Sequence, residues 1–183
     1  MSPHPVSFAV EDSTLQIGDS VRFFFSYPTE VVDENEDTLQ IDEGISLVVS
    51  SGVLKARMDT LDNDSLVVRY SRRLLTGDDE MFFDRRVIKG KQLGYDSFEA
   101  ERVGQSWQVE LLYIPRKDTA YFLQPYISQF SSTSLAVEEG ICYEGDGDLG
   151  CSLFVEENQF NRIRDFLPDV QDSTALFGFV VKQ

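Results

Sequence analysis

The stretch ISLVVSSGVLKARM, residues 45–58, carries the clearest secondary-structure signal in the chain. Apolar residues alternate over 45–49 and again over 54–58, which is the period-two pattern of a β-strand with one buried face. Between these halves lies the dipeptide Ser51-Gly52, which has the composition of a two-residue turn. We therefore predict a β-hairpin whose tip is Ser51-Gly52.

Outward from this stretch, most of the chain has the composition of β-strands. Further strands are predicted at 6–10, 20–27, 65–71, 81–90, 95–103, 106–114, 119–127 and 174–181. Pro125 interrupts one of them, and because proline has no N–H to donate, it predicts an edge strand or a bulge. One helix is predicted over 156–167, where apolar residues form a stripe that ends before Pro168.

Together these patterns predict that residues 1–183 form a single β-rich domain of the all-β class. About nine or ten short antiparallel strands would close into a barrel or pack as a sandwich, with one late α-helix at about 156–167. Successive hairpins favour the barrel. Longer connections at 28–44 and 128–134 would equally let strands change sheets, as in a sandwich.

The chain is strongly acidic, with a formal net charge of -16 and a pI near 4.3. Binding to nucleic acid or anionic lipid needs a surplus of Lys and Arg, so both are disfavoured as partners. The first residues lack the basic and apolar segments of a signal peptide, and no apolar run reaches the roughly 18 residues that span a bilayer. We expect no membrane partner, and a location in the cytoplasm or in a particle assembled there.

Charge is segregated along the chain. The segment at about 29–44, predicted as a solvated loop with a short edge strand at 38–41, contains seven acidic residues and no Lys or Arg. The stretch 69–91 is rich in arginines, interleaved with aromatic and acidic residues. Pairing of the two regions, within one chain or between subunits, and simple charge alternation on outward strand faces are both favoured over nucleic-acid binding. The candidate partner-binding residues are Arg69, Arg72, Arg73, Arg85, Arg86, Glu34, Glu36 and Asp37.

The segment CYEGDGDLGC, residues 142–151, contains the only two cysteines of the chain. Glu144, Asp146 and Asp148 have the alternate spacing of the first ligands of a calcium loop, but the later positions lack the Gly and Glu that such a loop requires. Because Gly and Asp are also turn residues, we favour a hairpin tip over a calcium site. The two cysteines would then face each other, as thiols in a reducing compartment or as a disulfide in an oxidising one.

Signals for enzymatic chemistry and for bound cofactors are weak. His4 is the only histidine, which leaves a serine or cysteine nucleophile without the usual imidazole base and excludes a zinc site built from several histidines. The chain has neither a GxxxxGK(S/T) phosphate loop nor a GxGxxG motif after a strand. We expect no cofactor and no catalysis. A pair of carboxylates that hydrolyses a glycoside is the remaining enzymatic alternative.

Two functions follow from these observations. The first is a non-catalytic structural or protein-interaction protein, a homo-oligomer or one subunit of a larger assembly such as a phage virion. The alternative is a β-barrel that binds a small apolar ligand, because the order of hairpins, late helix and closing strand resembles lipocalin-like barrels in outline. The residues expected to line its cavity are Phe23, Phe25, Trp107, Tyr113 and Phe122.

Overall fold

The computed structural model describes residues 5–9, 15–32, 36, 38–41, 44–60, 66–130, 142–145, 148–151, 154–155 and 177–183. These residues form seventeen β-strands and one short 3-10 turn, η1 (Gly77–Asp79), so the predicted all-β class is confirmed. The helix predicted over 156–167 lies outside the described residues, and the part of the chain that is described contains no α-helix.

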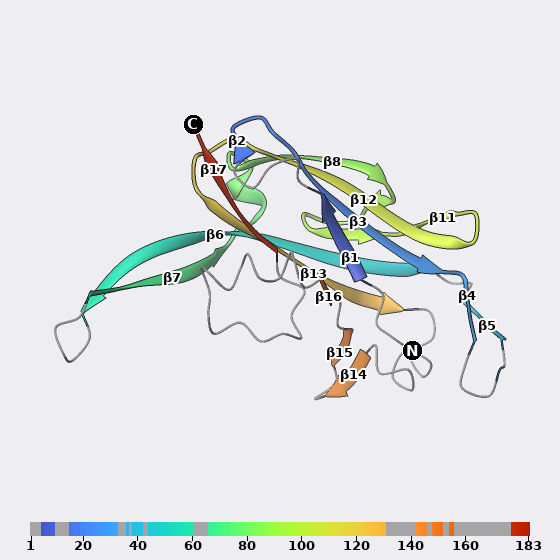
Figure 1. Ribbon diagram of the computed structural model, residues 1–183. Helices are drawn as coiled ribbons and strands as arrows, with labels where there is room; N and C mark the ends of the chain where they lie inside the picture. The colour runs from blue at the N-terminus through green and yellow to red at the C-terminus, as the bar shows by residue number, and fades with distance from the viewer. Residues whose placement is uncertain are drawn as a thin grey trace.

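The strands form two large sheets and one small hairpin (Figure 1). The first sheet has the order β11 (Glu101–Val103), β12 (Ser106–Pro115), β3 (Val21–Pro28), β1 (Pro5–Ala9) and β16 (Phe154–Val155), and β12 also pairs with β8 (Phe83–Lys89). The second has the order β14 (Cys142–Gly145), β15 (Asp148–Cys151), β13 (Ala120–Phe130), β6 (Ile45–Thr60), β10 (Ser97–Glu99) and β9 (Lys91–Gln92). In the second sheet, β6 also pairs with β7 (Leu66–Leu74), β13 with β17 (Phe177–Lys182), and β17 with β2 (Leu15–Gln16). The hairpin consists of β4 (Glu30–Val32) and β5 (Thr38–Gln40).

The hairpin predicted at Ser51-Gly52 is wrong, because β6 continues through this dipeptide as one strand of 16 residues. Neighbouring strands approach Gly52 too closely for a side chain. A Cβ at this position would lie 2.3 Å from the Phe122 ring of β13 and 2.6 Å from the Arg73 carbonyl oxygen of β7. Glycine is therefore explained by a crowded strand centre and not by a turn. The hairpin of this region is formed instead by β6 and β7.

The segment 95–103, predicted as one strand, is divided between the two sheets. β10 pairs with β6 in the second sheet, whereas β11 pairs with β12 in the first. Ala100 lies between them, is buried, and donates its N–H to the Ile45 carbonyl at 2.8 Å. Apolar alternation predicts an extended chain but does not encode which neighbour each half pairs with.

Pro125 lies within β13, which pairs with β6 on one side and with β17 and β15 on the other. The predicted edge position is therefore wrong for the strand as a whole, whereas the alternative, a bulge, has a counterpart two residues further on, where the register with β6 shifts between Ile127 and Gln129. The N–H of Val49, which is opposite Pro125, donates away from β13 to the Asp96 carbonyl at 2.8 Å. The side of Pro125 that lacks an N–H therefore faces away from β6. On that side Pro125 lies between residues 120–123, which pair with β17, and Ile127, which pairs with β15.

The core draws residues from both sheets. Along β3, Val21, Phe23, Phe25 and Tyr27 are buried while the residues between them are exposed or half-buried. Residues on one face of β6, β12, β13 and β17 belong to the same buried cluster. The two curled sheets are antiparallel except for the parallel pairs β1 with β16 and β17 with β2, and they share their inner faces as a sandwich or half-barrel.

Candidate functional site

The long strand β6 places the acidic segment and part of the basic stretch at opposite ends of the molecule. A strand of 16 residues spans roughly 50 Å at about 3.3 Å per residue. The hairpin of β4 and β5 precedes the first residue of β6 in the chain, and β7 pairs with its last part, from Gly52 to Thr60. In Figure 1 that hairpin lies at one side of the molecule and the far end of the β6 and β7 pair lies at the other.

We call residues 30–43 the acidic hairpin, since they contain seven acidic residues and no Lys or Arg. The short strand predicted at 38–41 is present as β5, and it pairs with β4, which the sequence does not predict. The Gln40 amide also donates to Glu30 Oε1 at 2.7 Å. Its base is anchored in the fold. The N–H of the buried Ile41 donates to the Thr29 carbonyl at 2.8 Å, and the Trp107 indole N–H donates to the Ile41 carbonyl at 2.8 Å.

We call residues 55–60 of β6 and 66–73 of β7 the basic ribbon, since these positions hold five Lys or Arg and one acidic residue. Residues 55–60 pair with β7 and with no other described strand. The outer edge of β7 likewise has no partner among the strands that the structure describes. The ribbon is therefore a two-stranded extension of the second sheet, and neither of its outer edges has a partner among the described strands.

Six of the candidate partner-binding residues belong to these two regions, and Arg73 is the one of them that already has an ion-pair partner within the chain. Arg69 and Arg72 lie in β7, and Arg72 is exposed and forms no ion pair with any described residue. The description does not extend to the side chain of Arg69. In the acidic hairpin Glu36 is exposed, while Glu34 and Asp37 lie outside the described residues.

The other two candidate arginines lie in β8 and contact other side chains of the chain. An Arg86 guanidinium nitrogen lies 3.6 Å from a carboxylate oxygen of Asp84. The guanidinium of Arg85 lies over the Tyr95 ring, 4.7 Å from its centroid. Arg86 therefore has a carboxylate partner within the chain, whereas Arg85 lies against an aromatic ring and has no carboxylate of a described residue within ion-pair distance.

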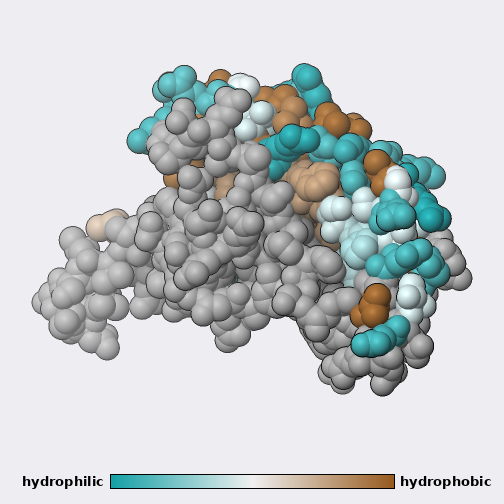
Figure 2. All heavy atoms as spheres, turned by 45° about the vertical axis from the view of Figure 1, so that its right-hand side comes forward, coloured by the Kyte–Doolittle hydropathy of each residue, from teal (hydrophilic) through white to brown (hydrophobic). Residues whose placement is uncertain are grey.

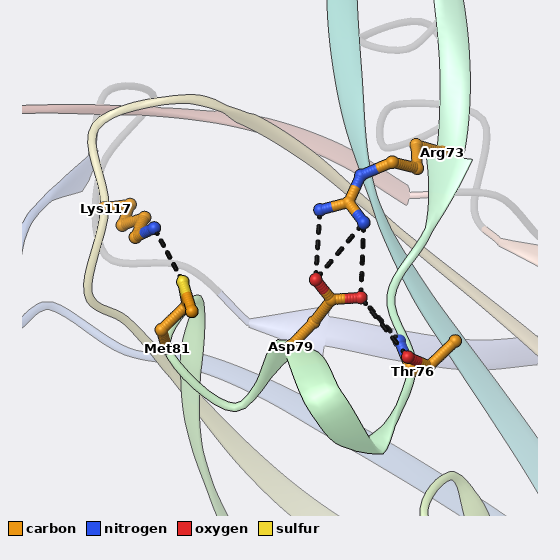
Figure 3. A network of polar contacts seen from close by, with 5 residues as sticks. All are labelled: Arg73, Thr76, Asp79, Met81 and Lys117. Carbon is orange, nitrogen blue, oxygen red and sulfur yellow. Dashed lines mark hydrogen bonds and ion pairs between the residues drawn. The ribbon is translucent and has the colours of Figure 1, made fainter.

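Arg73 belongs to a polar network that braces the turn between β7 and β8 (Figure 3). Its guanidinium donates to the Asp79 carboxylate at 3.1 to 3.3 Å, and the Thr76 N–H donates to the same carboxylate at 3.0 Å. The hydrogen bond from Thr76 and those from Arg73 lower the pKa of Asp79 below its usual range. The Phe82 ring lies between two cations, 5.4 Å from the Arg73 guanidinium and 4.4 Å from the Lys117 ammonium nitrogen.

The predicted hairpin at 142–151 is present as β14 and β15, with Cys142 directly opposite Cys151 in the backbone register. Glu144 and Asp148 lie on opposite strands, and Asp146 lies outside the described residues. Within the described ranges, no group of three or more His, Cys, Asp or Glu side chains is arranged to hold a metal ion. The side chains of these three acids lie outside the description, so the calcium hypothesis stays a prediction.

The residues predicted to line an apolar cavity are not brought together. Phe23 and Phe25 are fully buried in the packed core. Trp107 packs against that core from its edge, and Phe122 lies on the opposite face of β13, against Gly52. Of the five, only Tyr113 lines a polar cavity formed by other described residues.

That cavity is polar and has a volume of about 310 Å³. It lies where β6, β8, β9 and β12 meet the turn that follows η1. The sequence gives no sign of it, because its residues come from positions as far apart as 51 and 116 and only the sheet pairing brings them together. The lining residues are Ser51, Glu80, Phe83, Asp84, Arg85, Gln92, Tyr95, Tyr113 and Arg116.

Comparison with protein-family models, with curated protein sequences and with solved structures found no match to this chain. In the described part of the chain, none of the secondary-structure elements is a helix with the length and apolar character needed to cross a bilayer.

Proposed function

We propose that this chain is a non-catalytic structural protein whose copies associate head to tail, the basic ribbon of one copy docking on the acidic hairpin of the next. The observation that carries the proposal is the position of the two regions at opposite ends of β6 (Figure 1). Charges separated by roughly 50 Å attract each other negligibly within one molecule, because the Debye length is about 8 Å at physiological ionic strength. The acidic hairpin and the basic ribbon can therefore attract each other only when they belong to different molecules.

The structure of the ribbon favours a partner. A two-stranded β-ribbon is marginally stable on its own in water, and an unpaired strand edge is a template for further pairing. Lys55, Arg57, Arg69 and Arg72 place positive charge along this ribbon, which discourages pairing between two ribbons and favours an acidic partner. The acidic hairpin of another copy would be such an acidic partner.

Charge, and not an apolar patch, is expected to direct the contact. On the face shown in Figure 2, the described hydrophobic residues are interspersed among hydrophilic ones. The exposed large hydrophobic side chains are distributed over several strands and turns, including Met58 and Leu74 near the ribbon but also Met81 and Leu93 elsewhere. Such scattered residues are ordinary on a protein surface.

A contact between two different surfaces of the same chain has a geometric consequence. Each copy retains one free ribbon and one free hairpin after the first association, so the assembly grows until it closes into a ring or continues as a filament. The high net negative charge of -16 keeps unspecific association low, since most surfaces of two copies repel each other. We therefore expect a discrete assembly that dissociates as salt increases.

A charge-reversal pair of variants tests the proposal. The ribbon variant carries Arg69→Glu and Arg72→Glu, and the hairpin variant carries Glu34→Lys, Glu36→Lys and Asp37→Lys. Each is expected to sediment as a monomer of about 20.8 kDa on its own. Mixed in equal amounts they are expected to reassemble, because each reversed surface then meets a complementary one. Arg73 and Arg85 are left unchanged because they have partners within the chain.

The matched control carries Lys91→Glu and Arg102→Glu, which changes the net charge as much as the ribbon variant does. Both residues are exposed, and neither forms an ion pair with a described residue. This control is expected to assemble like the unmodified chain. Loss of assembly in the control, or failure of the mixed variants to reassemble while both remain folded by circular dichroism, would contradict docking of ribbon on hairpin.

A further inference from the structure

The polar cavity contains a cation that the fold does not neutralise. Arg85 is half-buried, and its guanidinium lies over the rings of Tyr95 at 4.7 Å and Phe98 at 5.2 Å. No carboxylate of a described residue lies within ion-pair distance of it. The two aromatic rings hold the side chain in place, so its fork of N–H donors is oriented before any partner arrives.

The negative charge in the cavity is compensated by other residues. Asp84 has Arg86 at 3.6 Å and Arg116 at 3.8 Å, so its carboxylate is matched without Arg85. Glu80 lines the cavity from an exposed position and forms no ion pair with a described residue. The cavity therefore presents one unmatched cation inside and one unmatched carboxylate at its exposed side.

Tyr113 provides an independent sign of a missing partner. Its side chain is 1% exposed, it lines the cavity, and its hydroxyl makes no hydrogen bond of good geometry with a described residue, although it interacts with the Arg85 side chain. A buried hydroxyl without a partner costs its full desolvation penalty, which is why such groups are rare in folded proteins. Burial raises the pKa of Tyr113 well above its usual range although the nearby Arg85 opposes the shift, so the hydroxyl keeps its proton to donate.

We propose that this cavity binds a small molecule bearing an oxyanion, a carboxylate or a phosphate, with Arg85 and the Tyr113 hydroxyl as its donors. An oxyanion is the partner that satisfies an unmatched guanidinium and an unmatched hydroxyl donor together. A volume of about 310 Å³ is at the lower end of the range for ligand sites, which restricts the ligand to a small one. Glu80 disfavours a second negative group, so polyanions are excluded and a ligand with an added ammonium or hydroxyl group is favoured.

This proposal is tested by titrating the folded protein, labelled with ¹⁵N, with inorganic phosphate, with acetate and with chloride at constant ionic strength. Saturable shifts of the Arg85 side-chain N–H and of the Tyr95 amide are expected with an oxyanion but not with chloride. Saturation with phosphate alone identifies a phosphoryl ligand, and saturation with acetate as well identifies a carboxylate ligand. Shifts that are the same with all three anions, or absent with all three, would overturn the proposal.

Two variants separate a ligand donor from a structural residue. Tyr113→Phe keeps the packed ring and removes the unpartnered hydroxyl, so it is expected to leave the melting temperature unchanged or higher while weakening binding of the oxyanion by about tenfold or more. Arg85→Lys keeps the charge but loses the fork, and should weaken binding while Arg102→Lys, on the exposed strand β11, should not. A Tyr113→Phe variant that melts lower and binds as tightly would show that the hydroxyl serves the fold and not a ligand.

Discussion

At the scale of single residues, Gly52 shows why the same dipeptide supports two interpretations. Glycine occurs in turns because it tolerates unusual backbone angles, and in strands where another chain segment approaches closely. The sequence offers both explanations, and only the positions of Phe122 and Arg73 on the neighbouring strands select the second. The choice between a turn and a strand at Gly52 therefore depends on Arg73 and Phe122, which lie 21 and 70 positions further along the chain.

Replacement of Gly52 is the first test at this scale. Gly52→Ala is expected to destabilise the fold by about 1–3 kcal/mol, because the added methyl group overlaps the Phe122 ring and a backbone oxygen that cannot easily move. Gly94→Ala is the control, since a Cβ there meets the Ser97 side chain at an ordinary 3.6 Å. Urea unfolding of both variants measures the difference. Equal stability of the two variants would show that β6 is not packed as described.

Tyr121 is expected to make the folded protein less stable at alkaline pH. Burial raises its pKa to about 12, although its hydrogen bond to the Lys117 carbonyl opposes the shift. An unfolded tyrosine has a pKa of about 10, so between these values the unfolded chain loses a proton that the folded chain retains. Stability must then fall as pH rises through this window.

The expected result is that Tyr121→Phe is less stable than the unmodified chain at neutral pH, by about 1 kcal/mol for the lost hydrogen bond, and that the difference narrows above pH 10 or so. Thermal unfolding at a series of pH values measures both effects. Melting temperatures that run parallel through the alkaline range would mean that the Tyr121 hydroxyl titrates normally in the folded protein.

At the scale of elements, alternation of apolar residues identifies extended segments well but does not identify their partners. The alternation in 20–27 and 106–114 predicts β3 and β12, which pair with each other, and the turn composition of 142–151 predicts the hairpin of β14 and β15. The turn predicted within 45–58 is wrong because Gly52 marks a close approach of neighbouring strands. The single strand predicted at 95–103 is wrong because a change of sheet leaves no local pattern. Likewise the acidic and basic regions are visible in the sequence, whereas their separation by β6 and the polar cavity are not.

The turn after β7 offers a test of one element. The pKa of Asp79 is lowered in the folded state, so its contribution to stability is present above the pKa of an unfolded aspartate and is lost as pH falls through the lower folded value. We expect Asp79→Asn to melt below the unmodified chain at neutral pH, and the difference to vanish in acid. Asp78→Asn, which removes the same charge from an exposed neighbour, should differ little at either pH. A difference that persists unchanged in acid would mean that Asp79 acts through its shape and not through its charge.

At the scale of the whole molecule, the fold places the acidic hairpin at one end and the basic ribbon at the other. The acidic hairpin is anchored to the core through Ile41, and the basic ribbon continues the sheet built on β6, so both ends are fixed to one framework. Ends with opposite charge would favour one relative orientation of neighbouring copies. The polar cavity belongs to neither end, so ligand binding and assembly can be examined separately.

Head-to-tail association is tested by the native mass of the purified protein, measured by light scattering at low salt and at about 1 M salt. At about 1 M salt the Debye length is about 3 Å. Head-to-tail association through charged ends predicts a mass several times the 20.8 kDa of the chain at low salt and a return to that value at high salt. A mass of 20.8 kDa under both conditions, or a larger mass that salt does not change, would contradict it.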